Sequence, residues 1–523
     1  MPSSPSEGRE YDLAVIGAGA AGLAGAVAAA ERGLTVALLD TAARPGGQFY
    51  RHPAPALGAT RPEALHHDWS AFTALRSRLA DSGVTPLAGH HVWTVVPAEP
   101  TGQWDVHALT GADGDGERPV RVRAHAVLLA TGAYERQLPF PGWTLPGVVG
   151  AGGAQAMLKS GLVLPGNGVS PARPKSRAGG RVVVAGSGPL LLAVAASLAT
   201  AGARVPAVIE ASGYLGYARH PGVLAANAHK MAEAAVHGAA LLRHGVRLRT
   251  RSAVTQVHGS DRVVAVTVSR LDRDWRPVRG SGRRIACDAL AVGHGLVPQL
   301  ELATGLGCAT RRTEDGTYAL DLDAHQETSV PGIWAAGETG GIGGVQLAFI
   351  EGELAGVAIA ARLRERTSGA DRGRVRALRR RRDRMRSFAS LMAAAHAPGP
   401  GWTRWLDGAT EVCRCEEVAA GRIRAAVADD GARDARTVKL LTRAGMGWCQ
   451  GRICGAAVAC LAAEAQGARL PPSPERRPLA VPVPLEVLGA LRATAAPEAA
   501  GSEAAGPEVA GPEESGPEEG ASG

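Results

Sequence analysis

The chain has 523 residues, a formal net charge of +8 and seven cysteines. Its length indicates three or four domains, and the few cysteines argue against a secreted disulfide scaffold and for a reducing cytoplasmic location. Aromatic residues make up 4% and arginines occur throughout, so we expect a solvated basic surface and no nucleic-acid partner. We expect no targeting segment and no membrane span, because four glycines interrupt the apolar run at 13–30.

An apolar strand, a glycine-rich turn and a helix open the chain at 11–33, and a second apolar strand follows at 34–40. This order predicts a parallel α/β sheet. Gly17, Gly19 and Gly22 form G-x-G-x-x-G between the first strand and the helix. The first glycine allows a tight turn, the second lets a pyrophosphate approach, and the third lets helix and strand pack closely. We therefore expect a dinucleotide at this helix N-terminus.

Asp40 ends the second strand, about twenty residues after the glycine turn. At this spacing, a carboxylate is placed to accept hydrogen bonds from the ribose hydroxyls of the dinucleotide. The alternative is a surface carboxylate that does no more than end a strand.

A second strand, glycine turn and helix follow the Gly, Pro and Ser-rich loop at 164–180. Gly186 and Gly188 begin the fingerprint, but Leu191 takes the third glycine position. Glu210, at the end of the next strand, would suit the 2′-hydroxyl of NAD and would repel the 2′-phosphate of NADP. Two alternatives stay open, namely NAD binding and a second domain that binds no nicotinamide.

The last third of the chain changes composition twice. A strongly basic stretch at 366–399, with four consecutive arginines at 379–382, predicts an exposed helical linker. Residues 400–467 then hold five of the seven cysteines and predict a compact separate module. Beyond residue 471 the chain is rich in Pro, Gly and Glu, and we expect this tail to be disordered because it cannot bury enough apolar surface to offset its ordering entropy.

Four cysteines in this module predict a metal centre. Cys413, Cys415, Cys449 and Cys454 give the spacing C-x-C-x33-C-x4-C. Zinc ligands usually come in pairs with two to four residues between them, so this spacing suits zinc poorly. Four thiolates with glycines beside the second pair favour a [2Fe–2S] cluster, with structural zinc as the alternative. We expect Cys460 to be buried and not a ligand.

Three further segments resemble the flavoproteins that carry two dinucleotide domains, such as glutathione reductase. They are RPGGQFYR at 44–51, VLLATGAYERQLPFPGW at 127–143 and TSVPGIWAAGETGGIGG at 328–344. The resemblance implies FAD at the first glycine turn, with further contacts from Gly47, Gln48, Thr131, Gly132, Gly337 and Glu338. The wider family usually has Asp where this chain has Glu338. The cysteine pair of the disulfide-reductase branch is missing beside Gly47, and we expect Cys287 and Cys308 to be core residues.

The same resemblance implies an α/β fold of two Rossmann-like domains, with the second inserted in the first, followed by a small helical module. The expected parts are an FAD domain at 1–155 and 298–365, a second nucleotide domain at 180–297, the basic linker at 366–399, the [2Fe–2S] module at 400–467 and the tail at 471–523.

The cysteine module at 411–462 resembles the bacterioferritin-associated ferredoxin-like domain. Residues 10–485 as a whole resemble the A subunits of opine oxidases, the B subunit of hydrogen cyanide synthase and subunits of proline or hydroxyproline dehydrogenases, and part of the sarcosine oxidase α subunit. This implies a subunit that helps to oxidise an amine, imino acid or opine, beside an amino-acid-oxidase-like flavoprotein subunit, with electrons leaving through the cluster to an external acceptor.

Two other functions stay open: a stand-alone NADH-dependent reductase, and a redox-sensing or assembly subunit without enzymatic activity. No catalytic residue can be named, because no group of His or carboxylate residues has a spacing that indicates a general base.

Overall fold

The computed structural model describes residues 9–58, 62–66, 68–99, 102–111, 117–166, 180–365, 368–465 and 479–489. The chain divides into two compact units, Met1–Pro482 and Val483–Gly523, and the helices and strands given below belong to the first. Of the tail expected at 471–523, all but residues 479–489 lies outside the described part. None of the helices described is both long enough and apolar enough to cross a membrane.

The first sheet has a parallel part and an antiparallel part that share one long strand, β6. The C-terminal half of β6 pairs in parallel with β1 and β19, and its N-terminal half pairs antiparallel with β5. The strands are β1 (Glu10–Ile16), β2 (Val36–Asp40), β3 (Val84–Ala88), β4 (His91–Ala98), β5 (Gln103–Thr110), β6 (Arg118–Leu129) and β19 (Ile333–Ala335). The central strands are continuously apolar because both faces of the sheet are buried.

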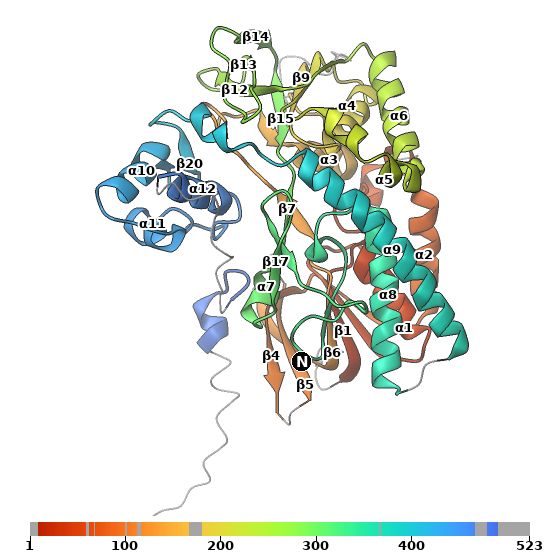
Figure 1. The fold of residues 1–523 in the computed structure, drawn as a ribbon. Helices are drawn as coiled ribbons and strands as arrows, with labels where there is room; N and C mark the ends of the chain where they lie inside the picture. The colour runs from red at the N-terminus through yellow and green to blue at the C-terminus, as the bar shows by residue number, and fades with distance from the viewer. Residues whose placement is uncertain are drawn as a thin grey trace, which may run out of the picture. The chain divides into compact units, whose positions relative to one another are not determined.

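Two helices pack on this sheet with their backbones almost in contact (Figure 1). They are α1 (Ala20–Ala30) and α8 (Val345–Leu363). A Cβ atom on Gly352 would lie 2.0 Å from the carbonyl oxygen of Ala21, and one on Gly356 would lie 2.3 Å from that of Gly25. Glycine at these positions therefore sets the close approach of the two helices, which places the start of α8 beside the first glycine turn.

The second sheet is parallel, in the order β11-β10-β9-β15-β8, and a smaller antiparallel sheet β12-β13-β14 belongs to the same domain. The strands are β8 (Val148–Gly150), β9 (Val182–Gly186), β10 (Ala207–Glu210), β11 (Arg247–Arg249), β12 (Ser252–His258), β13 (Ala265–Arg270), β14 (Arg283–Ala286) and β15 (Ala289–Gly293). Helices α3 (Ala151–Gly161), α4 (Leu190–Thr200) and α6 (Ala228–Arg243) cover it.

Two predicted strand, turn and helix units are thus confirmed, but one boundary differs from the expectation. Strand β8 pairs with β15 of the second sheet, and α3 packs on α4. The second sheet therefore begins before residue 155, where we expected the first domain to end. The cause is that β8 joins the sheet edge through its backbone and carries no glycine fingerprint that the sequence could reveal.

The basic stretch forms the predicted helix, α9 (Gly369–Ala395). Ser368 caps its N-terminus by accepting a hydrogen bond from the backbone N–H of Asp371 at 3.0 Å. The helix is not a free linker, because Leu378 and Met385 are buried against Leu354 and neighbouring residues of α8. Figure 1 shows α9 running beside α8.

The cysteine module contains β20 (Glu411–Cys413), β21 (Val418–Ala419), α10 (Ala420–Ala428), α11 (Ala435–Thr442) and α12 (Gly455–Ala465). It shares a hydrophobic core with the second nucleotide domain. Trp405 stacks on Trp275 with ring centroids 6.0 Å apart and donates its indole N–H to the Trp275 carbonyl at 2.9 Å. Trp143 donates its indole N–H to the Glu411 carbonyl at 2.7 Å, two residues before Cys413. The module is therefore fixed to the domain of the second sheet by tryptophan contacts.

Candidate functional site

The first glycine turn has the geometry that the sequence predicts. Gly17 has φ +105°, and a Cβ atom there would lie 2.4 Å from the Ala130 carbonyl oxygen. A Cβ atom on Gly22 would lie 1.8 Å from the Gly17 carbonyl oxygen. Any side chain at either position would collide with backbone atoms, which cannot rotate away. The turn therefore offers bare backbone to a ligand at the N-terminus of α1.

A second loop crosses this turn at Gly47. Its φ is +59°, and a Cβ atom there would lie 2.8 Å from the Cα of Gly19. Asp40 lies at the same place, because its Oδ2 accepts from the backbone N–H of Ala18 at 2.5 Å and its Oδ1 from that of Ala42 at 2.7 Å. The structure thus brings Asp40, Gly19 and Gly47 together into one cradle without bulky side chains, and this cradle fits a dinucleotide pyrophosphate and ribose.

Three other predicted residues make contacts within the protein. Thr131 donates its hydroxyl to the Gln299 carbonyl at 2.8 Å, and the N–H of Gln299 donates to the Gly132 carbonyl at 2.9 Å. These bonds join the end of β6 to the return of the chain from the second domain. Gln48 accepts from the Arg51 guanidinium at 2.7 Å through its side-chain oxygen.

A buried lysine that the sequence did not single out supports the loop after Gly47. Lys159 on α3 is 6% exposed and donates its ammonium to the Phe49 carbonyl at 3.0 Å. The same ammonium lies 5.0 Å from the centroid of the Phe49 ring. Burial lowers the pKa of Lys159 to about 8. This residue therefore joins the first helix of the second domain to the loop that borders the cradle.

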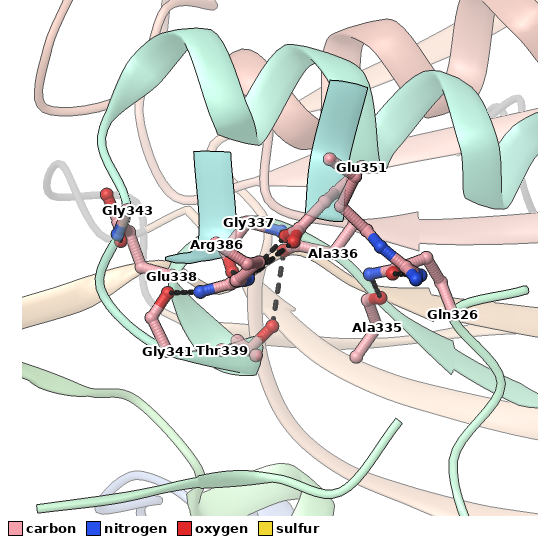
Figure 2. A network of polar contacts seen from close by, with 12 residues as sticks. Gln326, Ala335, Ala336, Gly337, Glu338, Thr339, Gly341, Gly343, Glu351 and Arg386 are labelled. Atoms are coloured by element: carbon pink, nitrogen blue, oxygen red, sulfur yellow. Dashed lines mark hydrogen bonds and ion pairs between the residues drawn. The ribbon is translucent and has the colours of Figure 1, made fainter. Parts of the chain in front are cut away.

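The turn after β19 rests on a buried ion pair (Figure 2). The Arg386 guanidinium, from α9, binds both oxygens of Glu351 at 2.8 Å, and Glu351 is 1% exposed. Glu351 also accepts from the Gly337 N–H at 3.1 Å, and Arg386 donates to the Gly341 carbonyl at 2.5 Å. Burial raises the pKa of Glu351, and the Arg386 guanidinium opposes that rise. The pair therefore clamps the turn that contains Gly337 and Glu338.

Glu338 itself faces the start of α8. Its carboxylate accepts from the N–H groups of Gly343 at 2.7 Å and Gly344 at 3.0 Å. Burial raises the pKa of Glu338, while these N–H groups oppose the rise. Glu is one methylene longer than Asp, and Glu338 uses this length to reach the glycine loop before α8. A contact between Glu338 and the ribityl chain of FAD stays a prediction.

Removing the arginine of the clamp should destabilise the first domain. We expect Arg386→Met to lower the unfolding free energy by about 3–5 kcal/mol, because it leaves the Glu351 carboxylate buried without its partner. Arg374→Met is the matched control, since its pair with Glu353 is half-exposed and should cost at most about 1 kcal/mol. Denaturant titration followed by flavin release measures both. Equal losses for the two variants would contradict the clamp.

The second glycine turn keeps the fold of the first but differs in what surrounds it. Gly186 has φ +136°, and a Cβ atom there would lie 1.7 Å from the Gly293 carbonyl oxygen. Leu191, in the third glycine position, is 1% exposed and packs in the core beside β9. Glu210 is fully buried and accepts from the N–H groups of Gly188 at 3.0 Å and Ser212 at 2.9 Å. Both oxygens of Glu210 therefore have backbone partners, as both oxygens of Asp40 have in the first turn.

The chain covers this turn with His396, the residue that ends α9. The Nδ1 atom of His396 lies 3.4 Å from Glu210 Oε1, and its Nε2 lies 3.0 Å from the hydroxyl of Tyr217. Ser187, in the middle of the turn, donates to the His396 carbonyl at 3.2 Å. His396 thus stands beside the carboxylate that would receive a nicotinamide nucleotide's ribose. No sequence pattern indicated this contact, because residues 187 and 396 are far apart in the chain.

The four predicted cysteines come together in the module. Cys413 ends β20, Cys415 follows in the turn, and Cys449 and Cys454 lie in the loop before α12. All four line one cavity of about 330 Å³, together with Arg414 and Ile453. A Cβ atom on Gly447 would lie 2.2 Å from the Cβ of Cys415, so glycine is required for the two cysteine segments to meet.

The thiols have the surroundings that a cluster requires. The N–H of Gly445 donates to the Cys413 sulfur at 3.4 Å, in the way that backbone amides support cluster sulfurs. Burial raises the pKa of Cys454, with Cys413 adding to the rise, so a bound metal cation would stabilise its thiolate. Cys460 lies on α12 outside this cavity, but it is half-buried where we expected it to be buried.

The spacing of the four cysteines favours the cluster over zinc. Two short segments supply two cysteines each, and all four line one cavity. This fits a binuclear [2Fe–2S] centre, whose ligands bind two separate iron atoms. Structural zinc, whose ligand pairs usually have two to four residues between them, fits the C-x-C spacing less well.

Comparison with known proteins identifies the class. The family model of pyridine nucleotide-disulphide oxidoreductases matches residues 11–352, and that of the BFD-like [2Fe-2S] binding domain matches residues 411–464. The chain therefore belongs to the pyridine nucleotide-disulphide oxidoreductase family and carries a C-terminal BFD-like [2Fe–2S] domain. FAD and a [2Fe–2S] cluster are its cofactors, as the sequence predicted.

Within this class, two relatives match almost the whole chain. Hydrogen cyanide synthase subunit HcnB of Pseudomonas aeruginosa is 34% identical over 84% of this chain and 90% of its own length. The A subunit of opine oxidase from Rhizobium meliloti is 33% identical over 87% of this chain and 92% of its own length. The resemblance to these subunits is thus confirmed. The crystal structure of L-proline dehydrogenase from P. horikoshii shares the fold, with a TM-score of 0.62 and 20% identity over 92% of this chain and 79% of that one.

Proposed function

We propose that the chain is one subunit of a dehydrogenase that oxidises a C–N bond of an amine, imino acid or opine. The named relatives are subunits of hydrogen cyanide synthase and opine oxidase, which supports both the substrate class and the need for a partner. The partner is an amino-acid-oxidase-like flavoprotein subunit. The seven cysteines are all unpaired, which supports a cytoplasmic location.

One observation carries the proposal: a dinucleotide cradle and a four-thiol cavity belong to the same compact unit. When bound, FAD exchanges an electron pair with an organic donor, and the [2Fe–2S] cluster carries electrons one at a time. Gly17, Gly19, Gly22 and Asp40 hold the dinucleotide, with Gly47 closing the cradle. Trp143 and Trp405 hold the cluster module in place against the second domain.

One side of the cluster site is exposed to solvent, so single electrons can leave there. Cys413 and Cys454 are buried, whereas Cys415 is exposed. Trp448, directly before Cys449, is 84% exposed. The cluster can thus meet an external acceptor at the surface around Cys415 while its other side faces the protein core.

The NADH-dependent reductase is the weaker alternative, because His396 covers the second glycine turn. We expect saturating NADH or NADPH to leave the flavin of the anaerobic chain oxidised, whereas dithionite reduces it. Rapid flavin bleaching by NADH would contradict this and favour the reductase.

The proposal is tested by anaerobic titration of the chain with proline, sarcosine and opines. The chain is purified together with the product of any oxidase gene encoded beside its own. We expect one of these donors to bleach the flavin and then to reduce the cluster. Reduction by NADH alone would assign a reductase. No reduction by any donor, with both cofactors present, would overturn the dehydrogenase and favour a sensing or assembly subunit.

A further inference from the structure

A second strongly basic segment lies outside the stretch at 366–399. Residues 247–284 contain ten arginines and three aspartates, and no lysine or glutamate, in a chain whose whole net charge is +8. These residues form β11 and the small antiparallel sheet β12-β13-β14. Neither the dinucleotide cradle nor the cluster cavity uses any of these arginines. The concentration of charge therefore calls for a separate explanation.

The strand register gathers part of this charge on one face of the small sheet. Ser252 lies directly opposite Arg270 in the pairing of β12 with β13, and Val268 lies opposite Arg283 in the pairing of β13 with β14. Directly opposite residues of antiparallel strands project from the same face, and so do residues two apart on one strand. The four side chains therefore share a face.

A cavity of about 310 Å³ opens on this face. Three arginines line it, Arg249, Arg270 and Arg283, and no carboxylate does. Val268, 3% exposed, also lines it and belongs to the hydrophobic core. Ser252, 6% exposed, completes the buried lining and donates its hydroxyl to the Thr250 carbonyl at 3.1 Å.

The three guanidinium groups have no ion-pair or hydrogen-bond partner in the part of the chain that the structure describes. Several arginines elsewhere in the fold are paired, as Arg123 is with Asp105 and Arg386 with Glu351. Like charges around one hollow repel each other, and a bound anion would remove that repulsion. Ser281 fixes the strand beneath them, because its hydroxyl accepts from the Arg270 N–H at 3.0 Å.

We propose that this cavity, the arginine pocket, binds a small phosphorylated ligand. Guanidinium forks match the oxygens of a phosphate group, and the hydroxyl of Thr250 adds a further donor at the rim. No aromatic side chain lines the pocket, so no base-stacking platform is offered and the phosphate group itself carries recognition. The site is distinct from the dinucleotide cradle and from the second glycine turn.

The test is calorimetric titration of the full chain, with FAD and cluster bound, by inorganic pyrophosphate at fixed ionic strength. We expect saturable binding that weakens at least tenfold in Arg270→Gln and again in Arg283→Gln. Arg262→Gln and Arg279→Gln are matched controls, because both side chains are exposed in the same segment and neither lines the pocket. They should change the affinity less than twofold.

Three outcomes would overturn the proposal. These are absence of pyrophosphate binding, equal weakening in the pocket variants and the controls, and tighter binding of succinate than of pyrophosphate. Equal weakening in all four variants would show that the anion binds a diffuse basic surface and not the pocket. Equal binding of a DNA oligomer by all four variants would lead to the same conclusion. Unchanged flavin and cluster spectra establish that each variant is folded.

Discussion

Cys413→Ala is expected to abolish the [2Fe–2S] cluster while leaving FAD bound. Cys413 is 1% exposed, lies at the end of β20 and lines the cluster cavity with the other three cysteines. Loss of a supporting residue outside the ligand set already costs about 10–100-fold in metal affinity, and loss of a ligand costs more. Reduction of an external acceptor should therefore fall roughly 100-fold or more. Iron and sulfide analysis, with electron paramagnetic resonance after dithionite reduction, measures the cluster.

The matched control for this variant is Cys460→Ala, in the same module. Cys460 lies on α12 and does not line the cluster cavity, so its iron and sulfide content should equal that of the unaltered chain. If Cys413→Ala retained two iron atoms, or if both variants lost iron equally, the ligand assignment would be wrong.

Gly22→Ala is expected to abolish FAD binding. The added methyl group would lie 1.8 Å from the Gly17 carbonyl oxygen, a backbone atom that cannot rotate away. Relief requires α1 to move away from β1, which opens the cradle beside Asp40 and disturbs the contact of α1 with α8. Overpacking of a core usually costs 1–3 kcal/mol, and we expect about 3 kcal/mol or more here. Flavin content after gel filtration and the unfolding free energy are the measurements.

Gly83→Ala serves as the control for this substitution. Gly83 precedes β3, has no restricted φ, and has no atom within 4 Å of the position of an added Cβ. The control should bind FAD as the unaltered chain does. Stoichiometric FAD in Gly22→Ala would show that the first glycine turn is not the cofactor site.

The features that the sequence predicted well are those set by local backbone geometry. Gly17 and Gly22 predict the turn because only glycine avoids the carbonyl oxygens that surround them. The cysteine spacing predicts the cluster for a related reason, since two short segments supply all four predicted ligands. These segments have to approach closely only at Gly447. In both cases, a few residues close together in the sequence determine the local geometry of the site.

The features that the sequence did not predict depend on packing between distant segments. Arg386 and His396 belong to a stretch with the pattern of a solvated basic helix, yet the first binds buried Glu351 and the second covers Glu210. In a stretch with many arginines, the sequence does not indicate which arginine is buried. Strand β8 was missed for a similar reason, because three residues that add to a sheet edge have too little pattern to separate them from a loop.

Helix α9 gains a clear role from these contacts. One residue of it clamps the turn after β19 in the first domain, and the residue at its end contacts the glycine turn of the second domain. It leads directly into Gly399, which packs against Trp275 beside the cluster module. The stretch that we expected to be an exposed linker is thus a packed helix. It contacts the first domain and the second domain and leads to the cluster module.

The central claim is that one chain holds a two-electron flavin and a one-electron iron–sulfur centre. Its most direct test is anaerobic titration of the purified chain with dithionite, alongside measurement of FAD, iron, sulfide and zinc. We predict one FAD, two iron atoms and two sulfides per chain, with about three electrons taken up in total. Uptake of two electrons with zinc in place of iron and sulfide, or a colourless chain, would contradict the account.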